Sequence, residues 1–143
     1  MKIALATDHA GFEMKEKIKT YLIEKGNEIQ DFGTFSDNSM DYPDAIHPAA
    51  TSIENGDNEM GVILCGSGQG AMITANKHQN IRASLPWSVE LAKLSRQHNN
   101  ANIITIAARF ISLELAKEMI NTFLSTNFEA GRHRTRVEKI ACM

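Results

Sequence analysis

Five short, mainly apolar segments alternate along the chain with longer segments in which apolar residues recur every three or four positions. The short segments predict strands of a sheet that is buried on both faces. The longer segments have the spacing of amphipathic helices. The expected strands are Lys2–Thr7, Glu28–Phe32, Gly61–Cys65, Ile81–Leu85 and Ile103–Ala107, and the expected helices cover residues 12–24, 43–55, 71–77, 88–97, 113–124 and about 133–142.

The regular alternation of strands and helices predicts an α/β fold. Each crossover between parallel strands places a helix against the sheet, so a five-stranded parallel sheet with helices on both faces follows. The chain has no repeat with a period of about 20–50 residues and no low-complexity linker. Its 143 residues suit one domain that spans residues 1–143.

The charge balance excludes one class of partner. Seventeen acidic residues against fifteen basic ones give a formal charge of −2, so the chain lacks the basic field on which nucleic-acid binding depends. No apolar segment approaches the roughly 20 residues that span a bilayer, and the N-terminus does not resemble a secretion signal, so no membrane association is expected. The two cysteines, Cys65 and Cys142, are then expected to be reduced thiols in the cytoplasm.

Reactive side chains follow three of the predicted strands. Ligands of an open parallel sheet bind beyond the carboxyl ends of its strands, where Asp8 and His9, Cys65, and Arg109 are expected. The alternative is that strand-to-helix turns simply favour aspartate, glycine and serine. Because Asp8 and His9 are adjacent and no other pair of histidines or cysteines has ligand spacing, no metal site is expected.

The sharpest local feature is the glycine-rich segment from Cys65 to Gly70. Its glycines allow close approach of the backbone to a ligand, and successive amides at a helix start attract an anion or a developing negative charge. A thiol in this field is favoured as the thiolate, which can act as a nucleophile or a base. The alternative is a buried structural cysteine at the end of a core strand. The spacing matches neither a dinucleotide-binding loop nor a P-loop.

His98 lies apart from these candidates. It ends the helix before the last strand, so it is expected at the amino edge of the sheet. This position favours a helix C-cap, and the second reading is that His98 serves the site of a neighbouring subunit.

The tail concentrates positive charge. Arg132 and Arg136 are four residues apart, so on a helix they share one face and can hold one compact anion such as a phosphate group. The alternatives are a solvated basic surface or a tail held by Glu129 and Glu138.

Several motifs in order resemble one family along essentially the whole chain. They are DHAGF at residues 8–12, DFGT at 31–34, DYP at 41–43, CGSGQG at 65–70, ANK at 75–77, LSRQHNNAN at 94–102 and GRHRTRV at 131–137. Together they resemble the type B ribose-5-phosphate isomerases and the related galactose-6-phosphate isomerase subunits. The resemblance implies a three-layer Rossmann-like fold and a homodimer, in some members a tetramer. It also implies a role in the pentose phosphate pathway and a reaction that needs neither metal nor cofactor.

The resemblance also implies an aldose–ketose isomerisation through an enediolate. Cys65 would be the base that moves a proton between C2 and C1 of the sugar. Ser67 and the amides of Gly66, Gly68 and Gly70 would stabilise the enediolate. Ser67 stands where threonine is frequent in the family, and the hydroxyl is retained.

The remaining functional residues would open and hold the sugar phosphate. His98 would help to open the furanose ring, with Asp8 and Asn99 also at the sugar. The residues that would bind the phosphate or line the sugar pocket are His9, Tyr42, Arg109, Arg132 and Arg136. A ring-opening histidine at the amino edge is best explained by a site shared between two subunits, with the C-terminal helix at their interface.

Two other functions remain open from the sequence. One is the isomerisation of a six-carbon sugar phosphate, such as allose or galactose 6-phosphate. The other is a non-catalytic sugar-phosphate-binding module, because a fold does not by itself define a function. The segment Leu85-Pro86-Trp87 carries no assignment and leaves the sugar preference open.

Overall fold

A five-stranded parallel sheet forms the centre of the computed structural model, which describes residues 1–142. The strands are β1 (Lys2–Thr7), β2 (Glu28–Asp31), β3 (Met60–Cys65), β4 (Ala83–Ser84) and β5 (Ile103–Ala107). Their order across the sheet is β2-β1-β3-β5-β4, and every neighbouring pair is parallel. The expected α/β architecture with a parallel sheet is therefore confirmed.

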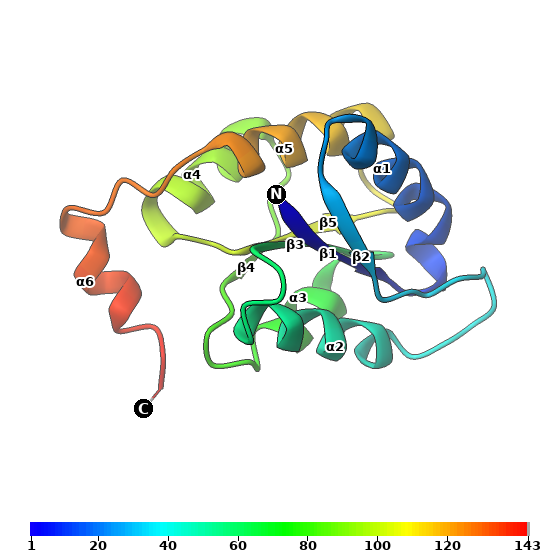
Figure 1. The fold of residues 1–143 in the computed structure, drawn as a ribbon, viewed down its shortest axis with the longest axis horizontal. Coiled ribbons are helices and arrows are strands. Elements are labelled where there is room, and N and C mark those ends of the chain that lie inside the picture. Colours follow the sequence, from blue (N-terminus) through cyan, green and yellow to red (C-terminus); the bar gives the residue numbers. More distant parts are fainter. Residues whose placement is uncertain (143) are drawn as a thin grey trace.

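Helices cover both faces of this sheet (Figure 1). They are the short η1 (His9–Gly11), α1 (Phe12–Glu24), α2 (Tyr42–Glu54), α3 (Gln69–Ala75), α4 (Val89–Asn99), α5 (Leu113–Ser125) and α6 (Arg132–Glu138). Helices α1, α4 and α5 lie on one face, and α2 and α3 lie on the other, which gives the three layers of a Rossmann-like fold. Among residues 1–142, no helix has the length and apolar character needed to cross a bilayer.

Alternate residues of the strands feed two separate apolar cores. In β1, Ile3 and Leu5 pack with α1 and α5, whereas Ala4 and Ala6 pack with α2 and α3. The second core is rich in small side chains, which include Ala45 and others along α2, so this helix lies close to the sheet. Both cores are dry, since their members are almost completely excluded from solvent.

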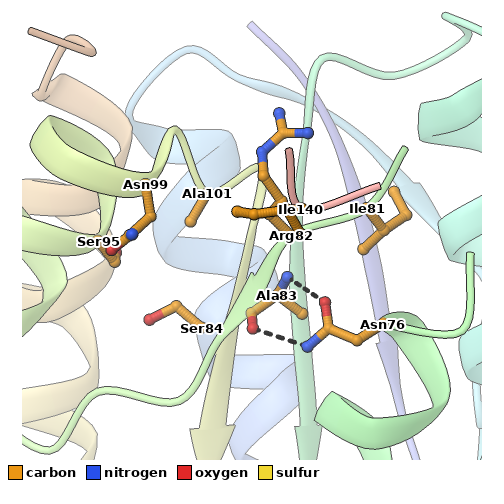
Figure 2. A pocket seen from close by; sticks show the side chains of 9 residues that line it. All are labelled: Asn76, Ile81, Arg82, Ala83, Ser84, Ser95, Asn99, Ala101 and Ile140. Atoms are coloured by element: carbon orange, nitrogen blue, oxygen red, sulfur yellow. Dashed lines mark hydrogen bonds between the residues drawn. The ribbon is translucent and has the colours of Figure 1, made fainter. Parts of the chain in front are cut away.

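Strand β4 is shorter than predicted, with two residues in place of the five from Ile81 to Leu85. Side chains take over the hydrogen bonds that a longer strand would make. The Asn102 Oδ1 accepts from the Arg82 N–H at 2.8 Å, and the Asn76 side chain bonds both the N–H and the carbonyl of Ala83 (Figure 2). Pro86 follows soon after and has no N–H to donate to a ladder.

Helix α6 begins at Arg132 and ends at Glu138, earlier than the predicted range of about 133–142. It contacts the C-terminal part of α4 and projects from the body of the molecule at the C-terminal end (Figure 1). None of its residues is buried. A short helix without a buried face gains little stability from its own chain, because most helix stability comes from tertiary packing.

A buried ion pair fixes the segment that leads from β2 toward α2. The side chain of Lys15 on α1 is fully buried, and its Nζ donates to both Asp31 carboxylate oxygens, at 2.9 and 2.8 Å, and to the Thr34 carbonyl at 2.8 Å. Burial alone would raise the pKa of Asp31. The hydrogen bonds from Lys15, the Gly33 N–H and Lys19 outweigh this effect, so the pKa lies below its ordinary value.

Replacement of Asp31 by asparagine is expected to lower the free energy of unfolding at pH 7 by about 3 kcal/mol, because it leaves the buried Lys15 charge with only the partly exposed Glu16 carboxylate, 3.3 Å away, as a counter-ion. The pKa of Asp31 is lowered in the folded state, so its contribution is present above pH 3.8 and is lost as the pH falls through the folded-state value. Urea unfolding at several pH values measures this. The exposed Asp37→Asn variant is the control, and a difference between D31N and wild type that does not shrink in acid would contradict the ion-pair account.

Candidate active site

Asp8 begins the turn after β1 and is mostly buried. Its Oδ1 accepts a hydrogen bond from the Ala10 N–H at 3.0 Å, so this oxygen caps η1. This is the role expected if aspartate is favoured here only because it stabilises a strand-to-helix turn. Among residues 1–142, nothing donates a hydrogen bond to its Oδ2. Asp8 therefore has one oxygen in a structural role and one that is available to a ligand at the carboxyl edge of the sheet.

The neighbouring His9 is held in a defined orientation. The Met40 N–H donates to His9 Nδ1 at 3.2 Å, so Nδ1 contributes its lone pair and the proton of the neutral ring resides on Nε2. An Nε2–H group is a hydrogen-bond donor and suits an anionic ligand. Met40 belongs to the segment that Lys15 and Asp31 anchor, so this ion pair indirectly supports the histidine.

Cys65 ends β3 and is 4% exposed. Its carbonyl accepts from the Ala108 N–H at 2.9 Å, and the Gly66 carbonyl accepts from the Arg109 N–H at 3.0 Å. These bonds fasten the start of the glycine-rich loop to the end of β5. Gly68 has a φ of +78° and precedes α3 directly, so the loop turns through a conformation that favours glycine before its amides enter the helix.

Side chains pack tightly over the loop glycines. A Cβ atom on Gly66 would stand 3.2 Å from Arg109 Nη1, and a Cβ on Gly70 would stand 2.5 Å from the ring of Tyr42. Arg109 and Tyr42 therefore lie against the loop because those two positions lack side chains. The structure thus brings Tyr42, which the resemblance implied for the sugar pocket, to the edge at which sequence reasoning placed the other candidates: Asp8, His9, Cys65, Gly66, Gly68, Gly70 and Arg109.

Ser67 is exposed at the tip of the loop, and its Oγ accepts from the Gln69 N–H at 3.4 Å. It borders an open, mainly apolar groove of about 480 Å³ whose other walls include Leu85 and Trp87. Leu85 also packs against Gly68, and the Trp87 side chain is 73% exposed. The segment that the sequence left unassigned is therefore a wall beside the loop.

The other predicted site residues lie at the opposite edge of the sheet. His98 and Asn99 end α4, and the chain then enters β5 at its amino end. Arg132 and Arg136 are exposed on α6, which contacts α4. Strand β5, with a rise of about 3.3 Å per residue, separates the two edges by roughly 13 Å or more. One chain therefore does not bring these residues to Cys65.

Asn99 borders a second open cavity, of about 420 Å³, which polar side chains of the α3–β4 region also line (Figure 2). Asn76, Ser84 and Ser95 contribute polar atoms to it. Ile140 closes one side, so the residues after α6 reach back to the body of the chain.

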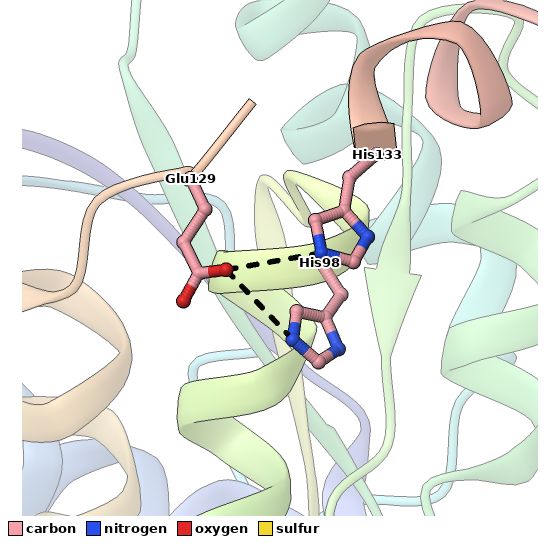
Figure 3. Close-up of side chains that lie close together, drawn as sticks. All are labelled: His98, Glu129 and His133. Atoms are coloured by element: carbon pink, nitrogen blue, oxygen red, sulfur yellow. Dashed lines mark ion pairs between the residues drawn. The ribbon is translucent and has the colours of Figure 1, made fainter. Parts of the chain in front are cut away.

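Two side chains that are distant from His98 in the sequence lie close to it in the structure. Its Nε2 lies 4.0 Å from Glu129 Oε2, and the His133 Nε2 lies 3.8 Å from the same oxygen (Figure 3). The two imidazole rings are stacked, with centroids 4.3 Å apart and planes 14° apart. The ligand-type atoms of His98, Glu129 and His133 lie within 4.8 Å of one another, a grouping that the spacing of these residues in the sequence did not show. The sequence separation of His98 and His133 explains why no local pattern showed it.

The electrostatics of this cluster favour an anion rather than a cation. Partial burial lowers the pKa of His133 below its ordinary value. A charge on His98 and the charges of Arg132 and Arg136 lower it further, against the opposing effect of Glu129. Arginines near a histidine pair repel an added cation and attract a group such as phosphate.

We call Asp8, His9, Tyr42, residues 65–70 and Arg109 the carboxyl-edge group. We call His98, Asn99, Arg132 and Arg136 the amino-edge group. The two groups have complementary chemistry. The carboxyl-edge group offers a thiol, a loop of backbone amides and a carboxylate, which suit the removal of a proton beside a carbonyl and the stabilisation of the resulting oxyanion. The amino-edge group offers imidazoles and guanidinium groups, which suit a phosphorylated ligand. A Rossmann-like protein with these groups is in the class of sugar-phosphate aldose–ketose isomerases.

Comparison with known proteins identifies the family within this class. The chain belongs to the ribose/galactose isomerase family, whose sequence model matches residues 3–140. It is 40% identical over 142 residues to ribose-5-phosphate isomerase B of Escherichia coli, which covers 99% of this chain and 95% of that protein.

Solved structures agree with this membership. A ribose 5-phosphate isomerase from Thermotoga maritima is 48% identical, with a TM-score of 0.96 over 98% of this chain and 97% of that one. Ribose-5-phosphate isomerase B from Mycoplasma genitalium, solved with bound ribulose 5-phosphate, is 36% identical. Its TM-score is 0.92 over 97% of this chain and 93% of that one.

Proposed function

We propose that this protein interconverts ribose 5-phosphate and ribulose 5-phosphate. The observation that carries the proposal is the placement of Cys65 at the end of β3, directly before a loop of backbone amides, in a chain that is alike over its full length to named ribose-5-phosphate isomerases. The reaction needs a base beside a carbonyl and donors for the oxyanion that forms, and this edge of the sheet has both.

The proposed chemistry begins with the open-chain sugar. The Cys65 thiolate removes the proton from C2 of the aldose, and the electrons of that C–H bond form an enediolate across C1 and C2. The amides of the loop and the Ser67 hydroxyl stabilise its negative oxygen. A proton then passes from O2 to O1. As the proton on Cys65 returns to C1, the electrons of the double bond between C1 and C2 form the new bond from C1 to hydrogen, and the O2 oxyanion becomes the C2 carbonyl. The product is the ketose, and the reaction needs no external oxidant or reductant.

The phosphate would anchor the substrate at the end away from the reacting carbons. His9 presents an Nε2–H donor, and Arg109 lies against Gly66 in the same group. Arg132 and Arg136 would complete the phosphate site from a second subunit, since in their own chain they lie at the far edge of the sheet. Binding energy from the phosphate then holds the reacting carbons in place.

We infer further that the protein works as a dimer with two shared sites. Each subunit, one domain over residues 1–143, would give its carboxyl-edge group to one site and its amino-edge group to the other. Helix α6 supports this arrangement because it has no buried residue and carries both tail arginines. His98 and Asn99 would enter the partner's site together with α6, and the sugar would lie between Tyr42 and these residues.

Parallel assays with ribose 5-phosphate, allose 6-phosphate and galactose 6-phosphate test the substrate. The expected kcat/KM for ribose 5-phosphate exceeds the other values by about tenfold or more, because a site that is built for one chain length misplaces the reacting carbons of a longer one. Higher kcat/KM for either hexose phosphate would contradict the proposal. Binding of all three without turnover would favour a non-catalytic binding module.

A further inference from the structure

Glu129 has no part in the chemistry described so far, yet its carboxylate faces the histidine that is proposed to open the sugar ring. We propose that Glu129 is a positioning residue, which keeps the proton of neutral His98 on Nε2 and so leaves the Nδ1 lone pair free for the sugar. This inference rests on the proposed isomerase function and extends it to the ring-opening step.

The geometry defines the direction of the interaction. Glu129 Oε2 lies 4.0 Å from His98 Nε2, too far for a hydrogen bond but close enough for its charge to act on the ring (Figure 3). A negative charge on this side of the ring favours the tautomer of the neutral imidazole that carries its proton on the facing nitrogen. Among residues 1–142, nothing forms a hydrogen bond with His98 Nδ1. This is the arrangement in which a carboxylate orients an imidazole whose other nitrogen acts on the substrate.

The backbone, rather than the carboxylate, holds Glu129 in place. Its N–H donates to the Gln97 carbonyl at 3.1 Å, one residue before His98. The Arg96 Nε also donates to the Thr126 carbonyl at 3.1 Å, which fastens the start of the same segment to α4. The side chain of Glu129 is 51% exposed and has no other ionic partner among the described residues than the two histidines. A change of this side chain therefore leaves the anchoring of the segment intact.

His133 shapes the same contact. Its ring stacks on His98 and is 12% exposed, so it limits the positions that the His98 ring can adopt. Partial burial, a charge on His98 and the charges of Arg132 and Arg136 all lower the pKa of His133, so a proton on His98 disfavours a second one on His133. Glu129 consequently faces one imidazole that becomes charged during the reaction and one that stays neutral.

The ring-opening step can be written in full. His98 Nδ1 takes the proton of the anomeric O1 hydroxyl, and the electrons of that bond form the carbonyl at C1 while the bond from C1 to the ring oxygen O4 breaks. The imidazolium then gives the proton to O4. The Glu129 carboxylate stabilises the imidazolium that exists between the two transfers.

Glu129→Gln tests the proposal, since glutamine keeps the shape and removes the charge. Ribulose 5-phosphate cannot form a furanose because its O5 carries the phosphate, so deuterium exchange at its C1 needs enediolate chemistry and no ring opening. We expect E129Q to lower kcat for ribose 5-phosphate by about tenfold to hundredfold, the range typical of lost orienting groups and of acid–base catalysis, with the exchange rate within about twofold of wild type.

A spectroscopic measurement on the wild type and E129Q complements the kinetics. In protein labelled with ¹⁵N-histidine, the nitrogen shifts of neutral His98 should report a proton on Nε2 in the wild type and a mixture of tautomers in E129Q. Glu138→Gln is the matched control, because it removes the same charge from an exposed position on α6 that has no ion pair among residues 1–142. This control should leave both rates and the His98 tautomer unchanged.

Three results would overturn the proposal. They are turnover of ribose 5-phosphate by E129Q within about twofold of wild type, equal losses of turnover and C1 exchange, and an unchanged His98 tautomer. Failure of the proposed function would look different, because the wild-type protein itself would then neither convert ribose 5-phosphate nor exchange the C1 proton of ribulose 5-phosphate.

Discussion

Cys65→Ala is expected to abolish exchange of the sugar C1 and C2 protons with solvent and to lower kcat for ribose 5-phosphate by about a thousandfold or more. Cys65 is the only residue at the carboxyl edge that the proposed chemistry uses as a base, and residues 71–77 supply no carboxylate to replace it. The measurements are turnover and deuterium incorporation from D₂O, each followed by NMR.

Two controls separate loss of the base from loss of the fold. Cys142→Ala removes the other thiol, which is exposed near the C-terminus, and should leave turnover unchanged. Inorganic phosphate should bind C65A with an affinity close to that of wild type, because the proposed phosphate ligands are untouched. Normal turnover by C65A would show that another group is the base, and loss of phosphate binding would show that the loop had collapsed.

The second large expected effect is the recovery of activity when two inactive variants are mixed. Cys65→Ala and His98→Asn are each expected to be inactive on ribose 5-phosphate, but an equal mixture should regain about a quarter of wild-type activity after subunit exchange. In a mixed dimer one site combines both defects, and the other combines an intact carboxyl-edge group with an intact amino-edge group. Half of the dimers are mixed, and each has one working site of two.

The matched control for the rescue is a mixture of Cys65→Ala with Ser67→Ala. Both changes lie in the carboxyl-edge group, so every site in a mixed dimer carries a defect and no activity should return. A mixture of Cys65→Ala with His98→Asn that stays inactive after verified subunit exchange would contradict the shared site. Full activity of a wild-type monomer of about 16 kDa in dilute solution would do the same.

Periodicity alone was enough to place most strands and helices, because a sheet buried on both faces requires mainly apolar strands. Lys2–Thr7, Phe12–Glu24 and Ile103–Ala107 were predicted to the residue. The length of strand β4 was overestimated because the side chains of Asn76 and Asn102 accept the hydrogen bonds of the Ala83 and Arg82 N–H groups, which a neighbouring strand would otherwise accept. Such substitutions of side chain for backbone leave no trace in an apolar pattern.

The candidate site, like the fold, could be predicted from the sequence only in part. Asp8, Cys65 and Arg109 could be grouped from the sequence, because parallel strands align their carboxyl ends at one edge. The contacts of Glu129 and His133 with His98 could not, since they depend on how the chain after α5 returns to the end of α4. Packing of that segment is a tertiary property, and no spacing rule describes it.

The placement of two half-sites on opposite edges of one sheet has an evolutionary consequence. In the proposed dimer, a chain that lost only its amino-edge group would still form one complete site with an intact partner. After gene duplication, one copy could therefore lose the cysteine group and the other the histidine–arginine group without loss of catalysis by the pair. With the shared site as proposed, the geometry of a single subunit would make the passage from a homodimer to an obligate pair of unlike chains a sequence of tolerated steps.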